Sequence, residues 1–166
     1  MYLIELEKHA DNRGYFARTY CEREFYSHGL KTHWVQCNIS FNKAKGTLRG
    51  MHFQSSPFQE TKLIRCGTGA IHDVVIDLRP ESGTYKQHLA IELSSENGKM
   101  LYVTEGFAHG FQTLTDNSEV VYQMSQFYSP EHSRGVRWDD PAFGIDWPRG
   151  DRIILDRDRS YPDFVG

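Results

Sequence analysis

The residues of this chain that could do chemistry gather in one stretch, residues 46–66, which reads GTLRGMHFQSSPFQETKLIRC. The stretch has the pattern of two apolar-rich strands joined by a polar, proline-containing turn. Arg49 and His52 lie on the first strand, whereas Glu60 and Lys62 lie on the second. Because antiparallel neighbours are only about 5 Å apart, a hairpin here would bring these side chains to one small ligand. We therefore expect a binding or catalytic site on this hairpin.

The spacing of Arg49 and His52 raises an objection to a shared site. Strict alternation along a strand places residues three apart on opposite faces. Both side chains would face one site only if Gly50 marks a β-bulge, which shifts the alternation. A single strand histidine is also more often structural than catalytic, so the residues alone leave both interpretations of His52 open.

A second histidine, His109, lies between two glycines in EGFAHGF, residues 105–111. Glycines in such a strand indicate that another group approaches the backbone closely. The spacing resembles the second metal motif of cupins, but the His-x-His pair of the first motif is missing at His52. With Glu60 the ligand set still lacks a member, and Lys62 adds a cation, whereas transition metals prefer at least three neutral or anionic ligands. We expect no metal ion and no other cofactor.

Five further polar residues interrupt or follow apolar segments. Asp73 and Asp77 lie in the most apolar strand, where a buried aspartate usually has a histidine or arginine partner. Tyr122 and Tyr128 lie in a strand and at its exit, and Asp158 has the composition of an exposed charged turn. Histidine, lysine, aspartate and tyrosine in one barrel interior would suit proton transfer without a metal.

Short strands at near-regular spacing predict an all-β jelly-roll sandwich or barrel. Besides the two strands of the hairpin, we expect strands at residues 2–6, 15–20, 33–40, 70–78, 86–93, 100–103, 107–114, 119–127 and 152–155. Residues 21–28 have the pattern of a short helix that ends at Gly29. The pair Asn97-Gly98 predicts a second hairpin, and the Trp/Pro/Gly-rich segment 138–148 suits an ordered cap.

Length and composition exclude several classes of protein. A chain of 166 residues fits a single domain, residues 1–166, with a substantial core. A net charge of −3 without a lysine/arginine run argues against a nucleic-acid partner. No apolar run suits a membrane span or a signal peptide. Cys21, Cys37 and Cys66 have no CxxC spacing and fit reduced thiols of a cytoplasmic protein.

Five motifs then occur in a fixed order: RGMHFQ at Arg49–Gln54, KLIR at Lys62–Arg65, DVVIDLR at Asp73–Arg79, GFAHG at Gly106–Gly110 and WDDP at Trp138–Pro141. Together they closely resemble the dTDP-4-dehydrorhamnose 3,5-epimerase family, and the likeness extends over nearly the whole chain. The resemblance implies a cupin-type jelly-roll barrel with short peripheral helices and no required metal. It also implies homodimers that lend N-terminal residues to the partner's site.

The resemblance further implies a reaction. A nucleotide-diphosphate 4-keto-6-deoxy sugar, dTDP-4-dehydro-6-deoxyglucose, would be epimerised at C3 and C5 to dTDP-4-dehydrorhamnose through an enolate. His52 would be the base and Asp158 would orient it. Lys62 would stabilise the enolate, and Tyr122 would return a proton to the opposite face.

Other matched positions would bind the substrate. Arg49 would hold the diphosphate, helped by Arg13 and Arg157. The remaining expected contacts are His109 and Asp73 in the pocket, Phe16 and Tyr128 on the base and sugar, and Gln36 and Asn38 as polar partners. The chain departs from the family at Arg18, where many members carry glutamate, and at Gln123, where lysine is frequent.

The same residues are compatible with several neighbouring functions. Related enzymes epimerise only C3, or act on GDP-, CDP- or heptose-linked 4-keto sugars. A metal-dependent cupin enzyme would also use histidines in a barrel interior, and a non-catalytic protein that binds sugar nucleotides would use the same polar pocket.

Overall fold

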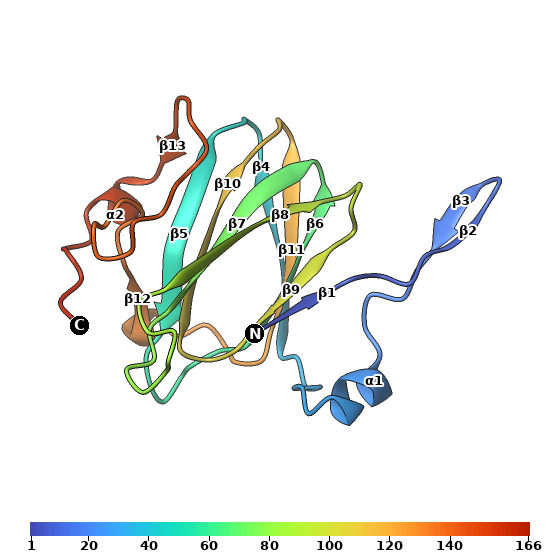
Figure 1. The fold of residues 1–166 in the computed structure, drawn as a ribbon, viewed down its shortest axis with the longest axis horizontal. Coiled ribbons are helices and arrows are strands. Elements are labelled where there is room, and N and C mark those ends of the chain that lie inside the picture. Colours follow the sequence, from blue (N-terminus) through green and yellow to red (C-terminus); the bar gives the residue numbers. More distant parts are fainter.

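The computed structural model describes residues 1–166 and shows two antiparallel sheets packed face to face (Figure 1). The first sheet contains, in spatial order, β1 (Tyr2–Ile4), β9 (Met100–Val103), β6 (Lys62–Thr68), β11 (Ser118–Met124) and β4 (Gln36–Asn42). The second contains β12 (Ser133–Gly135), β5 (Thr47–Gln54), β10 (Phe107–Thr113), β7 (Ala70–Asp77) and β8 (His88–Ser94), with β13 (Ile153–Ile154) parallel to β5. The chain changes sheet at nearly every connection, so the expected jelly roll is confirmed.

The helical elements are short and peripheral, as expected. They are α1 (Glu22–Ser27), a 3₁₀ turn η1 (Pro130–His132) and α2 (Asp156–Arg159). The chain leaves α1 through Gly29, whose φ of +68° is the left-handed conformation that glycine favours after a helix. No helix in the structure is long and apolar enough to cross a membrane.

Both predicted hairpins are wrong. β5 and β6 lie in opposite sheets, and so do β8 and β9, which flank Asn97-Gly98. Both turns form, and the Asn97 side chain accepts hydrogen bonds from the backbone N–H groups of Ser94 and Lys99. A turn signal reports only that the chain reverses, whereas the burial pattern of each strand decides which sheet it joins. The polar side chains of β5 and β6 therefore meet across the interior instead of side by side in one sheet.

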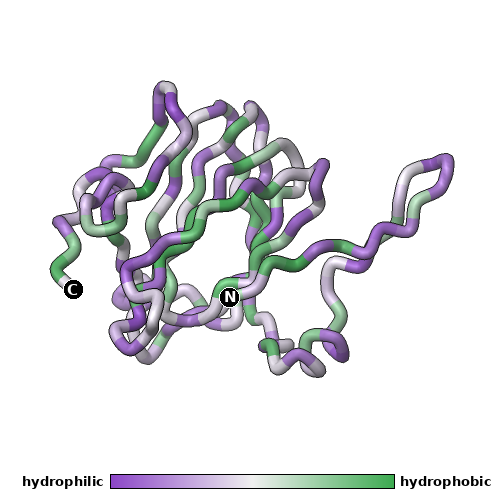
Figure 2. The backbone as a smooth tube through the Cα atoms, viewed as in Figure 1, coloured by the Kyte–Doolittle hydropathy of each residue, from purple (hydrophilic) through white to green (hydrophobic).

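Three apolar clusters hold the layers together. One fills the space between the sheets and includes Ile64, Val75 and Phe111. A second lies on the outer face of the second sheet, where Phe143 and Trp147 of the expected cap pack. A third forms where α1 covers the outer face of the first sheet. Figure 2 shows the hydrophobic stretches gathered in the strands, with largely hydrophilic loops between them.

The N-terminal hairpin projects from this body. β2 (His9–Asp11) and β3 (Gly14–Phe16) pair only with each other and form an arm that extends away from the two sheets (Figure 1). β3 covers less of the chain than the strand expected at residues 15–20, because no further partner strand continues the pairing. An isolated hairpin of this size is only marginally stable in water.

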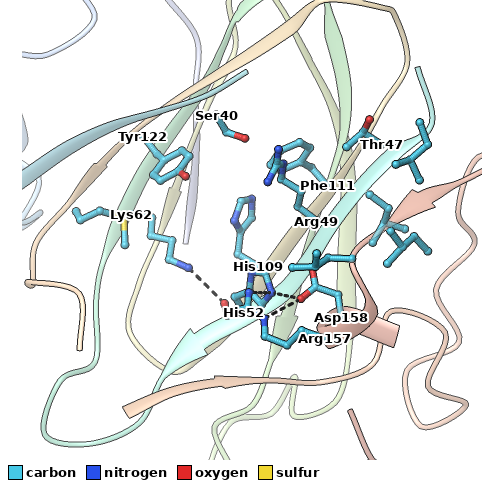
Figure 3. Close-up of a pocket in the computed structure, with 15 residues that line it drawn as sticks. Ser40, Thr47, Arg49, His52, Lys62, His109, Phe111, Tyr122, Arg157 and Asp158 are labelled. Atoms are coloured by element: carbon cyan, nitrogen blue, oxygen red, sulfur yellow. Dashed lines mark hydrogen bonds and ion pairs between the residues drawn. The ribbon is translucent and has the colours of Figure 1, made fainter. Parts of the chain in front are cut away.

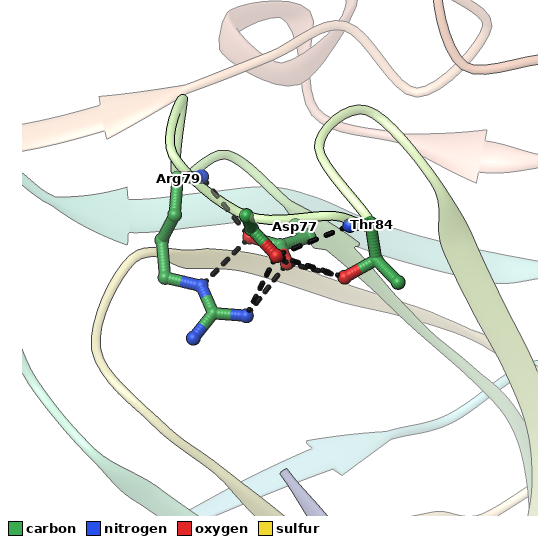
Figure 4. Close-up of polar contacts among 4 residues, drawn as sticks. Asp77, Arg79 and Thr84 are labelled. Carbon is green, nitrogen blue, oxygen red and sulfur yellow. Dashed lines mark hydrogen bonds and ion pairs between the residues drawn. The ribbon is translucent and has the colours of Figure 1, made fainter.

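A buried carboxylate organises the connection between β7 and β8 (Figure 4). Asp77 is 1% exposed and accepts hydrogen bonds from the Arg79 guanidinium and from the hydroxyls of Ser82 and Thr84, at 2.6–2.8 Å. Burial raises the pKa of Asp77, but the hydrogen bonds from Arg79, Ser82 and Thr84 lower it by more, so the net pKa lies well below its usual range. The expectation that this aspartate has an arginine partner is confirmed.

Replacing this carboxylate should destabilise the fold in a pH-dependent way. Asp77→Asn should lower the free energy of unfolding by about 2–4 kcal/mol at pH 7, because Arg79 loses its anionic partner and the amide cannot accept the same bonds. Since the folded-state pKa is depressed, the carboxylate's contribution is complete above the unfolded-state pKa, about 3.9, and is lost as pH falls below it. Urea unfolding between pH 7 and pH 3 measures both effects.

The exposed pair between Arg137 and Asp139 provides the control. Asp139→Asn should change the free energy of unfolding by less than about 1 kcal/mol at any pH, because exposed pairs contribute little. A stability deficit in Asp77→Asn that stays the same at pH 3 and pH 7 would contradict the assignment.

Candidate active site

A bulge in β5 places the two key side chains of that strand on the same face. His52 pairs with His109 of β10, and Arg49 pairs with Phe111, so two residues of β5 lie opposite a single residue of β10. This is the count of a β-bulge. Arg49 and His52 therefore both point into the space between the sheets, and the bulge at Gly50 that a shared site requires is present.

Two glycines make this bulge possible. A Cβ atom on Gly50 would lie 2.4 Å from the Cα atom of Gly110, and the φ of Gly50 is +130°. Gly110 is equally crowded, because a Cβ atom there would lie 2.6 Å from the Met51 sulfur. The close approach expected beside His109 is thus made by the neighbouring strand.

A cavity of about 520 Å³ opens between the sheets beside the bulge (Figure 3). Part of its wall is formed by β13, by Leu155 and by Arg157 and Asp158 of α2. Its polar lining consists of Ser40, Thr47, Arg49, His52, Lys62, His109, Tyr122, Arg157 and Asp158. Seven of the sequence-predicted site residues thus meet in one cavity.

His52 is hydrogen-bonded to Asp158. Its Nε2 atom lies 2.8 Å from Oδ1 of Asp158, and the backbone N–H of Gly50 donates to Oδ2 at 3.2 Å. Asp158 is 2% exposed, so the expectation of an exposed charged turn is wrong: α2 turns this carboxylate inward. Burial raises the pKa of Asp158, but hydrogen bonds from His52, Gly50 and Arg157 lower it by more, so the group is ionised and can orient the imidazole.

A second histidine–carboxylate pair lies on the inner face of the second sheet. The Nε2 atom of His109 is 2.7 Å from Oδ1 of Asp73, which is fully buried. The predicted partner of Asp73 is therefore confirmed. This pair orients the His109 ring at the cavity wall.

Lys62 enters the cavity from the opposite sheet. Its Nζ atom lies 3.1 Å from Oε1 of Glu60 and donates to the backbone oxygen of His52 at 3.3 Å. Lys62 and Glu60 are each 8% exposed. A buried ammonium in this position suits a ligand that carries or develops negative charge.

Tyr122 comes from β11 and lies across the cavity from Asp158 (Figure 3). Burial raises the pKa of its phenol, and the nearby Arg49 cation offsets only part of that effect. The hydroxyl is therefore protonated at neutral pH and is available as a proton donor.

Arg49 is held by one buried amide. Asn42 is 2% exposed, and its Nδ2 donates to the backbone oxygens of Ser40 and Ser118 at 3.0 and 3.2 Å. Its Oδ1 must then face Arg49, whose Nε donates to it at 2.8 Å. The two Nη groups of Arg49 make no hydrogen bond within the chain, so they present a fork to an anionic ligand.

The other predicted ligand contacts lie at the rim or outside the cavity. The Nη2 atom of Arg157 is 3.1 Å from Nε2 of His52. Gln36 accepts a hydrogen bond from the backbone of Tyr128 at 2.7 Å. Neither Gln36 nor Tyr128 lines the cavity, and Asn38 does not line it either. Arg13 and Phe16 lie on the projecting arm, where Phe16 is 69% exposed and Arg13 pairs with Asp11.

Sequence reasoning missed several contributors. Ser40 and Asn42 share the inner face of β4, because they lie at even spacing from Asn38, which pairs with Tyr122. A signal for them was therefore present in the alternation of β4. The role of Glu60 as the partner of Lys62 was also not predicted. No three His, Cys, Asp or Glu side chains are arranged to hold a metal ion.

Comparison with known proteins gives consistent matches over nearly the whole chain. Residues 1–165 match the family described as dTDP-4-dehydrorhamnose 3,5-epimerase. A relative of that name from Sinorhizobium fredii is 45% identical over 161 residues, covering 96% of this chain and 83% of the relative.

Solved structures agree with this match. The crystal structure of dTDP-4-dehydrorhamnose 3,5-epimerase from Bacillus anthracis, with TDP and PPi bound, superposes with a TM-score of 0.94 at 41% identity, covering 98% of this chain and 93% of that one. ChmJ, a 3'-monoepimerase from Streptomyces bikiniensis in complex with dTDP-quinovose, superposes with a TM-score of 0.91 at 30% identity, covering 98% and 82%.

The geometry around Arg49 leads to a binding prediction. Asn42→Ala should weaken the binding of inorganic pyrophosphate about tenfold, or about 1.4 kcal/mol, because the guanidinium loses the acceptor that aims its fork. Isothermal titration calorimetry measures the change. In an Arg49→Ala background the same Asn42→Ala change should have no further effect, since Asn42 would act only through Arg49. Equal losses in both backgrounds would show that Asn42 acts by another route.

Proposed function

This chain belongs to the dTDP-4-dehydrorhamnose 3,5-epimerase family, and on that premise we propose that it converts dTDP-4-dehydro-6-deoxyglucose to dTDP-4-dehydrorhamnose by epimerisation at C3 and C5. The observation that carries the proposal is the arrangement around the cavity. A histidine–carboxylate pair lines one wall, a protonated tyrosine lines the other, and a buried ammonium lies beside them. These are the groups that inversion next to a carbonyl requires.

The reaction uses the acidity of hydrogens next to the C4 carbonyl. His52 removes the proton from C3 or C5, and Asp158 holds one ring nitrogen so that the other is free to act as base. The electron pair moves into the carbonyl, and the Lys62 ammonium stabilises the enolate oxygen. Tyr122 then protonates the same carbon from the opposite face, which inverts it. General acid–base catalysis of this kind contributes about 10²–10⁴-fold.

The remaining residues bind the substrate. Arg49 holds the diphosphate through its two free Nη groups, with Arg157 at the rim. His109, oriented by Asp73, contacts the sugar. Further contacts to the sugar and base are assigned to Gln36, Asn38, Tyr128, Arg13 and Phe16.

We further propose that the active form is a homodimer in which the β2–β3 arm completes the partner's site. Arg13 and Phe16 are placed on the arm, away from the cavity of their own chain. Ile39 and Phe41 on the outer face of β4 are also exposed, at 64% and 51%, which suits an interface. We assign the 166 residues to a single epimerase domain. A cytoplasmic location fits the three free cysteines.

A C3-only epimerase is the second candidate. The similarity to ChmJ, a 3'-monoepimerase, supports it, and the same base, acid and ammonium would serve inversion at one carbon as at two. The two candidates differ in which substrate hydrogens exchange with solvent.

The first test is solvent exchange of the substrate. With wild-type protein in deuterated water, NMR should show deuterium entering dTDP-4-dehydro-6-deoxyglucose at C3 and C5. His52→Ala should slow exchange at both carbons by at least about 10²-fold, because it removes the base. Circular dichroism should show that the variant is folded.

Each other outcome has a distinct meaning. Deuterium at C3 alone would select the C3-only epimerase. No exchange with wild-type protein would overturn the proposal, and full exchange in His52→Ala would assign the base to another residue.

The shared site predicts complementation between two inactive variants. An arm variant, Arg13→Ala/Phe16→Ala, and His52→Ala should each be nearly inactive as homodimers. After refolding from an equimolar mixture, activity should reach about one quarter of wild type, because half of the dimers are mixed and each has one complete site. A mixture as inactive as its parents, or an arm variant with full activity, would contradict the exchange of arms.

A further inference from the structure

One buried carboxylate beside the cavity has no part in the mechanism above. Glu60 precedes β6 and is 8% exposed, yet it does not line the cavity. Its Oε1 atom lies 3.1 Å from the Nζ atom of Lys62, and Oε2 is buried without a hydrogen-bond partner. Nothing else in the fold uses this carboxylate. Because burying an anion is costly unless it is paired, its one evident role is toward Lys62.

We propose that Glu60 is a positioning residue that keeps Lys62 charged and aims it at the enolate oxygen. The inference rests on the proposed function, in which Lys62 stabilises the enolate. It assigns to Glu60 no contact with the substrate.

The Lys62 ammonium has two fixed partners within the chain. A lysine ammonium has three N–H donors and no acceptor. The ammonium forms an ion pair with Oε1 of Glu60 and donates one hydrogen bond to the backbone oxygen of His52. N–H donors therefore remain for the cavity, which Lys62 lines. The two fixed partners hold the ammonium beside His52, where a ligand would meet it.

The pairing with Glu60 also bears on the charge of Lys62. Burial favours the neutral amine of a lysine, and a neutral amine would stabilise an enolate poorly. The titratable groups that line the cavity with Lys62 are Arg49 and His52 of β5 and His109 of β10 in the opposite sheet, and Tyr122 of the neighbouring strand β11. None of these four is an anion.

The anions nearby do not change this conclusion. Asp158 of α2 also lines the cavity, but this carboxylate is paired with His52. The other α2 residue in the lining, Arg157, is a cation, and β4 contributes only the uncharged Ser40. Glu60 is the one carboxylate that forms an ion pair with Lys62. Since it lies outside the cavity, the positive end of the pair faces the substrate.

The test compares wild type with Glu60→Gln, which keeps the shape and one acceptor oxygen but removes the charge. Initial rates of deuterium exchange at saturating substrate would be measured from pH 6 to pH 9.5. The wild-type to variant ratio of kcat should be about twofold or less near pH 6 and should rise to about tenfold or more above pH 9, because the unpaired ammonium loses its proton at lower pH. KM should change by less than about twofold, since Glu60 makes no substrate contact.

Two variants separate this role from a structural one. Glu60→Asp retains the charge and should recover most of the activity at high pH. Glu105→Gln removes a carboxylate that pairs with Lys31, outside the cavity, and should match wild type at every pH. A ratio that is constant with pH, or a Glu60→Gln variant equal to wild type, would overturn the proposal.

A measurement without turnover keeps the proposal separate from the function it rests on. The ¹³Cε resonance of Lys62, assigned by its loss in Lys62→Met, reports the protonation of its ammonium. Its titration should move to lower pH in Glu60→Gln than in wild type. If wild-type protein exchanges no substrate hydrogen, the proposed function fails, while this titration still supports or overturns the role of Glu60.

Discussion

The site depends on the β-bulge in β5, where two residues of that strand lie opposite Gly110 of β10. Without the extra residue, alternation would turn either Arg49 or His52 to the outer face, under the cap. With it, the guanidinium and the imidazole share one interior, and the chain continues with Met51 buried in the outer core. This single bulge thus lets one strand supply both an anion-binding guanidinium and a proton-accepting imidazole. It requires a backbone conformation at Gly50 that only glycine can adopt.

The interior around this bulge is polar, and it is held by pairs. Asp158 holds His52, Asp73 holds His109, and Glu60 holds Lys62, each carboxylate being almost fully buried. Asp158 and Asp73 come from α2 and β7 and hold histidines of other strands, whereas Glu60 lies two residues before Lys62. Such pairs contribute little net stability after desolvation is counted. What they provide is a fixed geometry in which each polar head has few other conformations.

Local features of the fold could be predicted from the sequence, and long-range ones could not. Alternation and turn residues identified nearly all the strands and the helix, because these depend on a few adjacent residues. Alternation also showed that Arg49 and His52 could share a face only with a bulge at Gly50, but it did not establish that bulge. The pairing of β5 with β6 was predicted wrongly, since neither strand's pattern says which sheet it joins. The burial of Asp158 was missed for a similar reason. DRDR has the composition of a surface turn, and only its packing against β5 turns one carboxylate inward.

The distance along the chain between His52 and Asp158 has a consequence for synthesis. The two residues are 106 positions apart, so a ribosome makes the base long before its carboxylate partner. Until α2 docks against β5, the imidazole has no anion to orient it, although most strands of both sheets have already been made. Closing a contact of such separation is late and entropically costly. The nascent chain should therefore fold before it becomes active, and a growing polypeptide that is already compact should still lack catalytic activity.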